Sequence, residues 1–261
     1  MIIKVNGINL NIQQRGAGSP TLVFLHYWGG SSQTWHRVID LLEPGFRTVS
    51  IDQRGWGKSE RPESGYALGD LADDAQEIIR ALHLERYILI GHSMGGKVAQ
   101  LLASRRPSAL IGLALVAPSP PSPMNIPLAV RHDMINAYAS RESIIETVER
   151  VLTHNKLHPD DLETVIADSL GGSSAAKAAW PLSASQEDIR AFVKRIELPA
   201  IIVSGDRDRV DPPEVLRREL LPWIPQAQFY MLPDVGHLSP FEAPAEVAHL
   251  LHTFALSLFE E

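Results

Sequence analysis

The sequence of 261 residues contains no cysteine, and this absence narrows the chemistry open to the protein. Without cysteine there is no disulfide framework, no thiolate zinc site, no iron–sulfur cluster and no cysteine nucleophile. Any covalent catalysis must therefore use another side chain.

The sequence also lacks a long hydrophobic run and an excess of positive charge. Its longest apolar stretch, residues 110–117, is far shorter than the roughly 20 residues that cross a bilayer. The 24 Lys and Arg are outnumbered by 31 Asp and Glu, whereas nucleic-acid-binding proteins concentrate basic residues. The first residues alternate around Asn6-Gly7 as in a β-hairpin, unlike a secretory signal. We therefore expect a cytoplasmic protein that binds neither membranes nor nucleic acid.

What is present indicates a layered α/β fold. Short aliphatic and β-branched runs predict buried strands, and the segments between several of them have helical spacing. The predicted strands are residues 21–25, 46–51, 87–90, 111–116, 200–204 and 228–232, and the predicted helices are 68–82, 94–105, 212–221 and 244–259. This alternation predicts a mainly parallel sheet with helices on both faces, and an active site at the carboxyl ends of the strands.

Residues 119–195 break the alternation. No strand pattern occurs there, but helical patterns recur at 126–139, 141–152, 159–169 and 187–195, after a proline-rich exit from the preceding strand. We interpret residues 119–195 as a helical cap inserted into a core of residues 1–118 and 196–261. A lengthened set of crossover helices is the alternative.

The strongest local signal is G-x-S-x-G at residues 91–95, between a predicted strand and a predicted helix. In this context the motif is typical of a nucleophile elbow, in which a strained turn presents the serine at the edge of the sheet. The alternative is a nucleotide-binding turn, but G-x-G-x-x-G and the P-loop lysine pattern are both missing. Ser93 is therefore the candidate nucleophile.

Serine needs a base, and ten histidines are available. His237 follows the last predicted strand, where its side chain can reach over the sheet edge towards Ser93. His26 and His92 lie in turns beside the expected site, where we expect them to donate or accept supporting hydrogen bonds. We predict that His237 is the base.

The acid that orients the base is expected after the strand at 200–204, where three aspartates follow. Asp211 precedes two prolines and a helix, so we expect it to cap that helix. Asp206 is expected to form the turn. Asp208 has no comparable structural role, and we predict that it is the acid.

The order Ser93, Asp208, His237, with the elbow on a central strand, resembles the α/β-hydrolase superfamily. Residues 26–30 (HYWGG) resemble the oxyanion turn of the family, residues 52–59 (DQRGWGKS) its D-x-R-G-x-G-x-S loop, and residues 205–208 (GDRD) its acid turn. The likeness spans nearly the whole chain. It implies an eight-stranded sheet, and it implies that residues 119–195 are a lid.

The resemblance also implies an oxyanion hole. The N–H of Met94, which follows the nucleophile, is expected as one donor, and that of Trp28 as the other, although Tyr27 stands where the family usually has glycine. Apolar side chains that could contact substrate are Tyr27, Trp56, Met124 and Trp180, which could equally belong to the core. No Arg or Lys can be placed at the site from the sequence. We therefore expect an apolar, uncharged small-molecule substrate.

These residues predict a serine hydrolase acting on small carboxylic esters, thioesters or lactones, with no metal or organic cofactor. The serine argues against the dehalogenase and epoxide hydrolase branches, which use aspartate at the elbow. Cofactor-free haloperoxidases or perhydrolases, and enol-lactone or carbon–carbon bond hydrolases, remain close alternatives. A small-molecule receptor that keeps the triad is an alternative of another class, and turnover separates it from an enzyme. The sequence does not predict the oligomeric state.

Overall fold

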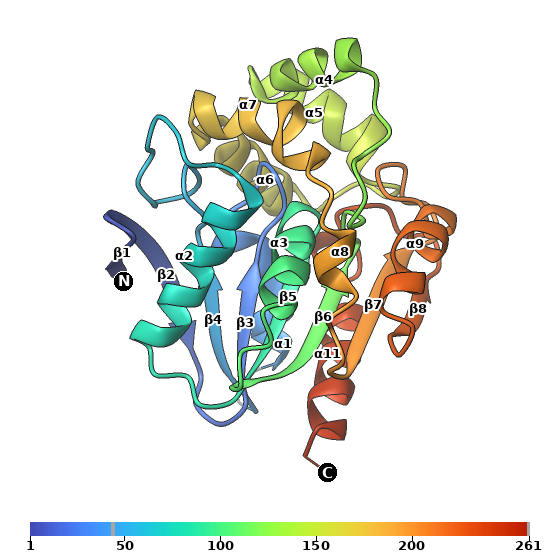
Figure 1. The fold of residues 1–261 in the computed structure, drawn as a ribbon. Helices are drawn as coiled ribbons and strands as arrows, with labels where there is room; N and C mark the ends of the chain where they lie inside the picture. The colour runs from blue at the N-terminus through green and yellow to red at the C-terminus, as the bar shows by residue number, and fades with distance from the viewer. Residues whose placement is uncertain (43–44, 260–261) are drawn as a thin grey trace.

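A computed structural model describes residues 1–42 and 45–259 and contains an eight-stranded sheet (Figure 1). The strands lie in the order β1-β2-β4-β3-β5-β6-β7-β8; β1 and β2 are antiparallel to their neighbours, and β3 to β8 are parallel. Their bounds are β1 Ile2–Val5, β2 Ile8–Arg15, β3 Thr21–Leu25, β4 Arg47–Ile51, β5 Tyr87–His92, β6 Leu110–Val116, β7 Ala200–Gly205 and β8 Gln228–Leu232. The mainly parallel eight-stranded sheet predicted from the sequence is confirmed.

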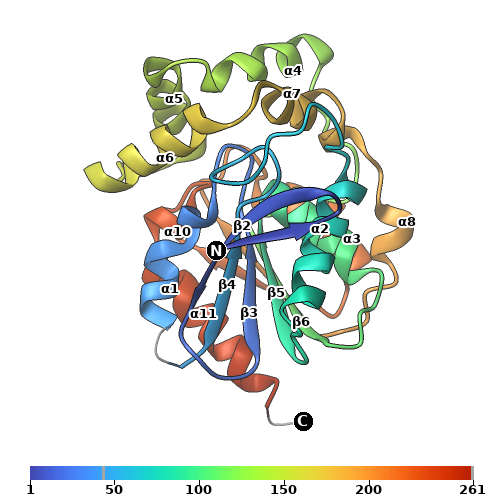
Figure 2. The same cartoon turned by 90° about the vertical axis from the view of Figure 1, so that its left-hand side faces the viewer.

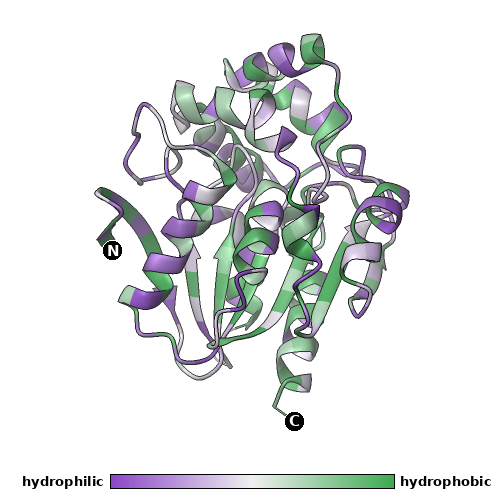
Figure 3. Ribbon diagram, viewed as in Figure 1, coloured by the Kyte–Doolittle hydropathy of each residue, from purple (hydrophilic) through white to green (hydrophobic). Residues whose placement is uncertain are grey.

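The central strands are continuous apolar runs because both faces of the sheet are covered. All residues of β3, β5 and β7 are buried. One face carries α1 (His36–Leu42), α10 (Ser239–Glu242) and α11 (Pro244–Ser257), and the other carries α2 (Leu68–Ala81), α3 (Met94–Ala103) and α8 (Arg190–Val193), as Figure 2 shows. Hydrophobic residues accordingly concentrate on the strands, while polar residues mark the outer side of α2 (Figure 3).

The strand register brings three loops to one edge of the sheet. Leu25 of β3 is paired with Gly91 of β5, and His92 of β5 with Val116 of β6. Parallel strands therefore end side by side, and the residues that follow them in sequence meet above that edge. Ser93 is the first residue beyond β5, so it lies where the three loops converge.

The segment between β6 and β7 forms helices above this edge (Figures 1 and 2). They are α4 Leu128–Met134, α5 Arg141–Thr147, α6 Pro159–Gly171, α7 Ser174–Leu182 and α8, with 3-10 turns η2 Ile135–Tyr138 and η4 Ala184–Gln186 and a π turn η3 Val148–Leu152. We keep the name cap for residues 119–195, although α8, at its end, contacts α3 of the core. The sequence did not predict α7, because its small residues show no apolar spacing and Pro181 lies inside it.

The remaining short elements connect the core. They are η1 Ser32–Trp35, α9 Pro213–Glu219 and η5 Leu221–Trp223. The expected hairpin at the start of the chain is present, with Asn6 and Gly7 in the left-handed conformation that such a turn requires. Among the described residues, no helix is long and apolar enough to cross a membrane.

Candidate active site

Ser93 occupies a sharp turn between β5 and α3. Its φ of 53° lies in the left-handed region that residues other than glycine rarely adopt. The flanking chain is packed too closely for side chains. A Cβ on Gly91 would lie 2.4 Å from the Gly95 carbonyl oxygen, and a Cβ on Gly95 would lie 2.6 Å from the His26 carbonyl oxygen. The motif therefore forms a strained strand-to-helix turn, the geometry of a nucleophile elbow.

His237 and Asp208 meet above the same edge. Asp208 lies in the loop after β7 and His237 in the loop after β8, and the distance from His237 Nδ1 to Asp208 Oδ2 is 2.8 Å. The other carboxylate oxygen of Asp208 accepts hydrogen bonds from the backbone N–H groups of Val210 and Asp211, at 2.8 and 3.0 Å. Both side chains are buried, so this pair is fixed in position and removed from water.

Ser93 and His237 line one cavity of about 390 Å³. Within the described residues, the Ser93 hydroxyl makes no hydrogen bond to the His237 ring. Catalytic hydrogen bonds are often long in ligand-free enzymes and shorten when substrate binds. The arrangement therefore brings the three residues to one site and leaves the serine–histidine contact to be made there.

The charge of His237 is set by the surrounding carboxylates. Burial alone would lower the pKa of this imidazole, but the charge and hydrogen bond of Asp208, with the more distant charges of Asp211 and Glu242, raise it above its ordinary value. The Nδ1–H must donate to Asp208, because a carboxylate can only accept. This tautomer leaves Nε2 of the neutral ring as a proton acceptor.

Two further buried histidines support the site and stay neutral. Burial lowers the pKa of His26 to about 4, and the pKa of His92 lies well below its ordinary value for the same reason. His92 Nε2 donates to the carbonyl oxygen of His237 at 2.8 Å. His26 Nδ1 donates to the carbonyl of Tyr27 at 2.7 Å, and its Nε2 accepts from the N–H of Gln53 at 3.0 Å. These are the hydrogen bonds expected of the two residues.

The cap holds the backbone of His237. The N–H groups of His237 and Leu238 both donate to the carbonyl oxygen of Leu152, at 2.9 and 3.0 Å. Leu152 is the last residue of the π turn η3, and the carbonyl groups at the end of a helical turn have no partner within it. The sequence gives no signal for this contact, because it depends on how a cap turn sits on a core loop.

Glu242 also joins the cap to the loop that carries His237. One of its carboxylate oxygens accepts from the N–H groups of His154 and Asn155, at 2.8 and 2.9 Å, and the other accepts from the N–H of Gly236 at 3.0 Å. Three backbone donors from the cap and the histidine loop thus share one carboxylate. This carboxylate fixes the residue immediately before His237.

Of the two expected oxyanion donors, Trp28 lines the cavity, and Met94 directly follows Ser93, which lines it. Met94 is the first residue of α3, and the first N–H groups of a helix have no partner within it. The carbonyl of Trp28 accepts from the Tyr138 hydroxyl of the cap at 2.9 Å, and the two rings are in tilted contact, with centroids 4.3 Å apart. That both N–H groups point at a substrate oxygen stays a prediction.

The cavity is largely apolar, and the cap supplies most of its wall. Three of the four residues expected to contact substrate, Tyr27, Met124 and Trp180, line it. The cap adds Ile126, Val130, Met134, Ala137, Val151 and Leu152.

Trp56 is the fourth expected contact, and it does not line this cavity. Its buried indole packs against Gly172 of the cap and lines a separate cavity of about 10 Å³, together with Met94 and Trp180. Trp56 therefore lies outside the Ser93 cavity, next to Trp180, which belongs to the wall of that cavity. We therefore correct the expectation and leave Trp56 out of the proposed substrate contacts.

Asp211 does not cap the following helix, contrary to expectation. The residue at the cap position of α9 is Pro212, and no side chain hydrogen bonds to the helix start. The Asp211 carboxylate instead turns inwards and accepts from the Ser119 hydroxyl at 3.1 Å. Burial raises its pKa to about 7. A helix-start pattern in the sequence cannot reveal that the carboxylate points into the core.

Lys97, one turn after Ser93 on α3, ties both ends of the cap to the core. Its fully buried ammonium donates to the carbonyl oxygens of Ser122 and Ser185, at 3.0 and 3.1 Å. Burial lowers the pKa of Lys97 to about 8. Ser122 lies where the chain enters the cap and Ser185 where it leaves, so one side chain joins the nucleophile helix to the two connections.

The loop of residues 52–59 is held by hydrogen bonds to Asp52. Asp52 accepts from Asn11 Nδ2 and from the N–H groups of Ser32 and Lys58, at 2.6 to 2.9 Å. None of these groups faces the cavity around Ser93. Among the described residues there is also no cluster of metal-ligating side chains.

One residue of the cavity was not anticipated. Arg209 lines it, although the sequence allowed no basic side chain to be placed at the site. It follows Asp208 in the chain, so a basic neighbour of the predicted acid is the signal that could have revealed it.

This chain is similar to known proteins over most of its length. The chain is 29% identical over 260 residues to the AB hydrolase superfamily protein YisY of Bacillus subtilis, covering 96% of each. It is 26% identical over 238 residues to the bifunctional esterase/perhydrolase DCH of Acinetobacter calcoaceticus, covering 85% of this chain and 86% of that protein. The structure of an esterase from Exiguobacterium antarcticum superposes with a TM-score of 0.89 over 98% of both chains, at 23% identity.

A family model gives the assignment. The model for the alpha/beta hydrolase fold matches residues 20–244, which include the sheet from β3 onwards, the whole cap and the loops that carry Ser93, Asp208 and His237. The chain therefore belongs to the alpha/beta hydrolase family.

Proposed function

We propose that the protein is a serine hydrolase that cleaves a small carboxylic ester, thioester or lactone through an acyl-enzyme on Ser93. The observation that carries the proposal is the convergence of a strained Ser93 and an Asp208-bound His237 on one apolar cavity. The class of ester is left open by this geometry. The expected cytoplasmic location stays a prediction.

The first half of the reaction forms the acyl-enzyme. His237 Nε2 takes the proton of the Ser93 hydroxyl as Oγ attacks the carbonyl carbon, and the carbonyl oxygen becomes an oxyanion. The N–H groups of Met94 and Trp28 stabilise this oxyanion, each by about 3 kcal/mol. His237 then gives its proton to the leaving oxygen or sulfur as the bond to carbon breaks.

The second half releases the acid. Water loses a proton to His237 and attacks the acyl carbon, and the proton then passes to Ser93 Oγ as the ester bond breaks. Asp208 stabilises the imidazolium in both halves and keeps Nε2 available as the base.

The test is labelling and turnover at Ser93. We expect a fluorophosphonate to modify Ser93, and para-nitrophenyl butyrate to be hydrolysed over many cycles. Ser93→Ala should lower kcat/KM by about 10⁴-fold or more. Ser108→Ala is the control, because Ser108 is exposed and does not line this cavity, so this variant should remain labelled and active. Labelling at another residue would overturn the site, and a single turnover per chain would favour a receptor.

A second function is supported by one relative. The similarity to an esterase/perhydrolase suggests that hydrogen peroxide could replace water in the second half, giving a peracid from the same acyl-enzyme. Measuring peracid formation during ester turnover, with and without peroxide, separates the two acceptors. No peracid at high peroxide would restrict the enzyme to hydrolysis.

A further inference from the structure

One basic residue, the exposed Arg209, lines the largely apolar cavity around Ser93. Among the described residues that line it, Arg209 is the only Lys, Arg, Asp or Glu. The neighbouring carboxylate of Asp208 does not neutralise it, since that group is fully engaged with His237 and two backbone N–H groups. The cation therefore stands beside an apolar space with no internal counter-charge in that wall.

Most N–H groups of the exposed Arg209 side chain make no hydrogen bond to the described residues of the protein. Its Nη1 donates to the carbonyl oxygen of Arg150 in the cap at 2.7 Å. Across residues 1–42 and 45–259, no carboxylate forms an ion pair with this guanidinium. Of the acids close in sequence to Arg209 or to Arg150, Asp206 pairs with Arg207 at 3.7 Å and Glu146 pairs with Arg150 at 2.9 Å. Asp234 also pairs with Arg207, at 3.4 Å. A guanidinium has five N–H donors, so four remain for another partner.

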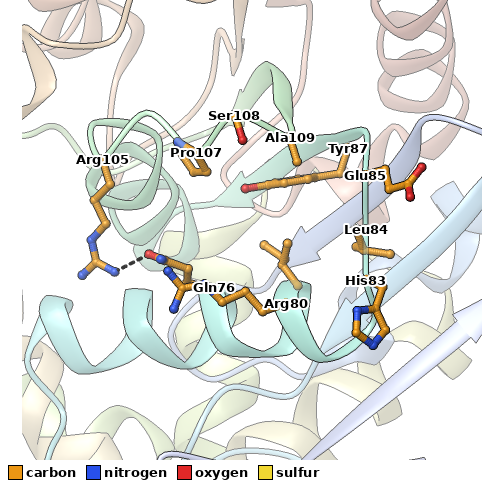
Figure 4. A pocket seen from close by; sticks show the side chains of 11 residues that line it. Gln76, Arg80, His83, Leu84, Glu85, Tyr87, Arg105, Pro107, Ser108 and Ala109 are labelled. Carbon is orange, nitrogen blue, oxygen red and sulfur yellow. Dashed lines mark hydrogen bonds between the residues drawn. The ribbon is translucent and has the colours of Figure 1, made fainter.

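A second cavity shows how different a fully paired basic wall is. It has a volume of about 520 Å³ and lies at the opposite end of the sheet, beside the first residue of β5 (Figure 4). Its Arg105 is bound to Asp73 at 2.7 Å and to Gln76 at 2.9 Å, and its Arg80 is bound to Glu77. The cations there are satisfied by the protein itself. Arg209 differs because its one side-chain hydrogen bond to the described residues is to a backbone carbonyl and not to a carboxylate.

We propose that Arg209 binds a carboxylate group of the substrate. The substrate class is then a small ester, thioester or lactone whose apolar body fills the cavity and which also carries a carboxylate. One guanidinium matches the single charge and the planar, two-oxygen geometry of a carboxylate. The inference rests on the proposed function and revises the expectation of an uncharged substrate.

The apolar surroundings make this contact selective. A charge pair interacts more strongly beside apolar walls than in open water, whereas a neutral substrate gains nothing from the guanidinium. Because Arg209 is exposed, salt should weaken the contact.

The experiment compares two esters that differ in one group. Para-nitrophenyl hexanoate ends in a methyl group, and the mono-para-nitrophenyl ester of adipic acid ends in a carboxylate on the same six-carbon acyl chain. The measured quantity is the ratio of kcat/KM for the acidic ester to kcat/KM for the neutral one. Arg209→Gln should lower this ratio about 10-fold and leave the neutral ester within about twofold of wild type. Arg209→Lys should retain part of the preference, and added salt should reduce it in the wild type.

Arg207→Gln is the matched control. Arg207 is two residues away, exposed, and paired with Asp206 and Asp234 outside the cavity, so its loss should leave the ratio unchanged. If Arg209→Gln lowers kcat/KM equally for the two esters, Arg209 supports the cap and the inference is overturned. The inference is also overturned if this substitution changes kcat/KM for neither ester. In both cases the proposed function stands, because the wild type still turns over the neutral ester. A wild type that hydrolyses neither ester would overturn the proposed function, and the inference with it.

Discussion

Two helices beside the same cavity are packed in opposite ways. All ten residues of α3, which follows Ser93, are buried, whereas α4 of the cap has no buried residue and exposes Leu128 and Val130 by 56% and 47%. Both contribute to one site, since Val130 lines the cavity that Ser93 opens into. The expected nucleophile thus directly precedes α3, which is completely buried, whereas part of the proposed substrate-binding wall belongs to α4, which has no buried residue.

The packing of α3 begins at its glycines, so the largest expected effect is at Gly95. In Gly95→Ala the new Cβ would lie 2.6 and 2.7 Å from the carbonyl oxygens of His26 and Leu25, and the turn must shift. We expect kcat/KM to fall about 100-fold, because small displacements at a catalytic group have effects of this size. The free energy of unfolding, measured by denaturation in urea, should fall by about 1–3 kcal/mol.

Gly69→Ala is the control for this prediction. Gly69 lies in α2, and a Cβ there would meet nothing within 4 Å. Alanine should stabilise this helix slightly and leave activity unchanged. Equal effects of the two substitutions would remove the contrast between the elbow and the rest of the core.

The pH profile tests whether the base is controlled by the core and not by the cap. His237 must be neutral to accept a proton, and its raised pKa keeps it protonated to higher pH. Activity should therefore be lost as the pH falls through a midpoint above 6.5, with kcat/KM decreasing about tenfold per pH unit below it. The midpoint should be the same in Val130→Ala, since the raising charges belong to Asp208, Asp211 and Glu242 of the core. A midpoint at or below the ordinary imidazole value would contradict this assignment.

Two valines provide the most direct and mildest comparison. Val98 of α3 is completely buried, and Val130 of α4 is about half exposed. Val98→Ala should lower the free energy of unfolding by about 2 kcal/mol, whereas Val130→Ala should change it by less than about 0.5 kcal/mol. Val130→Ala should instead raise KM for an apolar ester by a few-fold, because apolar surface in the cavity wall is lost. Stability curves and steady-state kinetics on the two variants measure both effects, and equal losses of stability would show that α4 is packed like α3.

The core was predictable because its signals are local. Strand runs, the glycines around Ser93 and the order of Asp208 and His237 can all be read within short stretches of sequence. The errors concern contacts between distant segments. Asp211 points into the core instead of capping α9, and Trp56 packs on Gly172 instead of substrate. Arg209 lines the cavity together with residues of the cap, so its position next to Asp208 in the sequence was the one local sign of it.

The carbonyl of Leu152 has a consequence for engineering. It belongs to the cap, yet it accepts the hydrogen bonds that hold the backbone of His237 and Leu238. A chimaera that exchanges the whole of residues 119–195 for the cap of another hydrolase would thus discard part of the support of its own base. Transplanting selectivity requires the graft to spare the η3 turn and replace only the helices on either side of it.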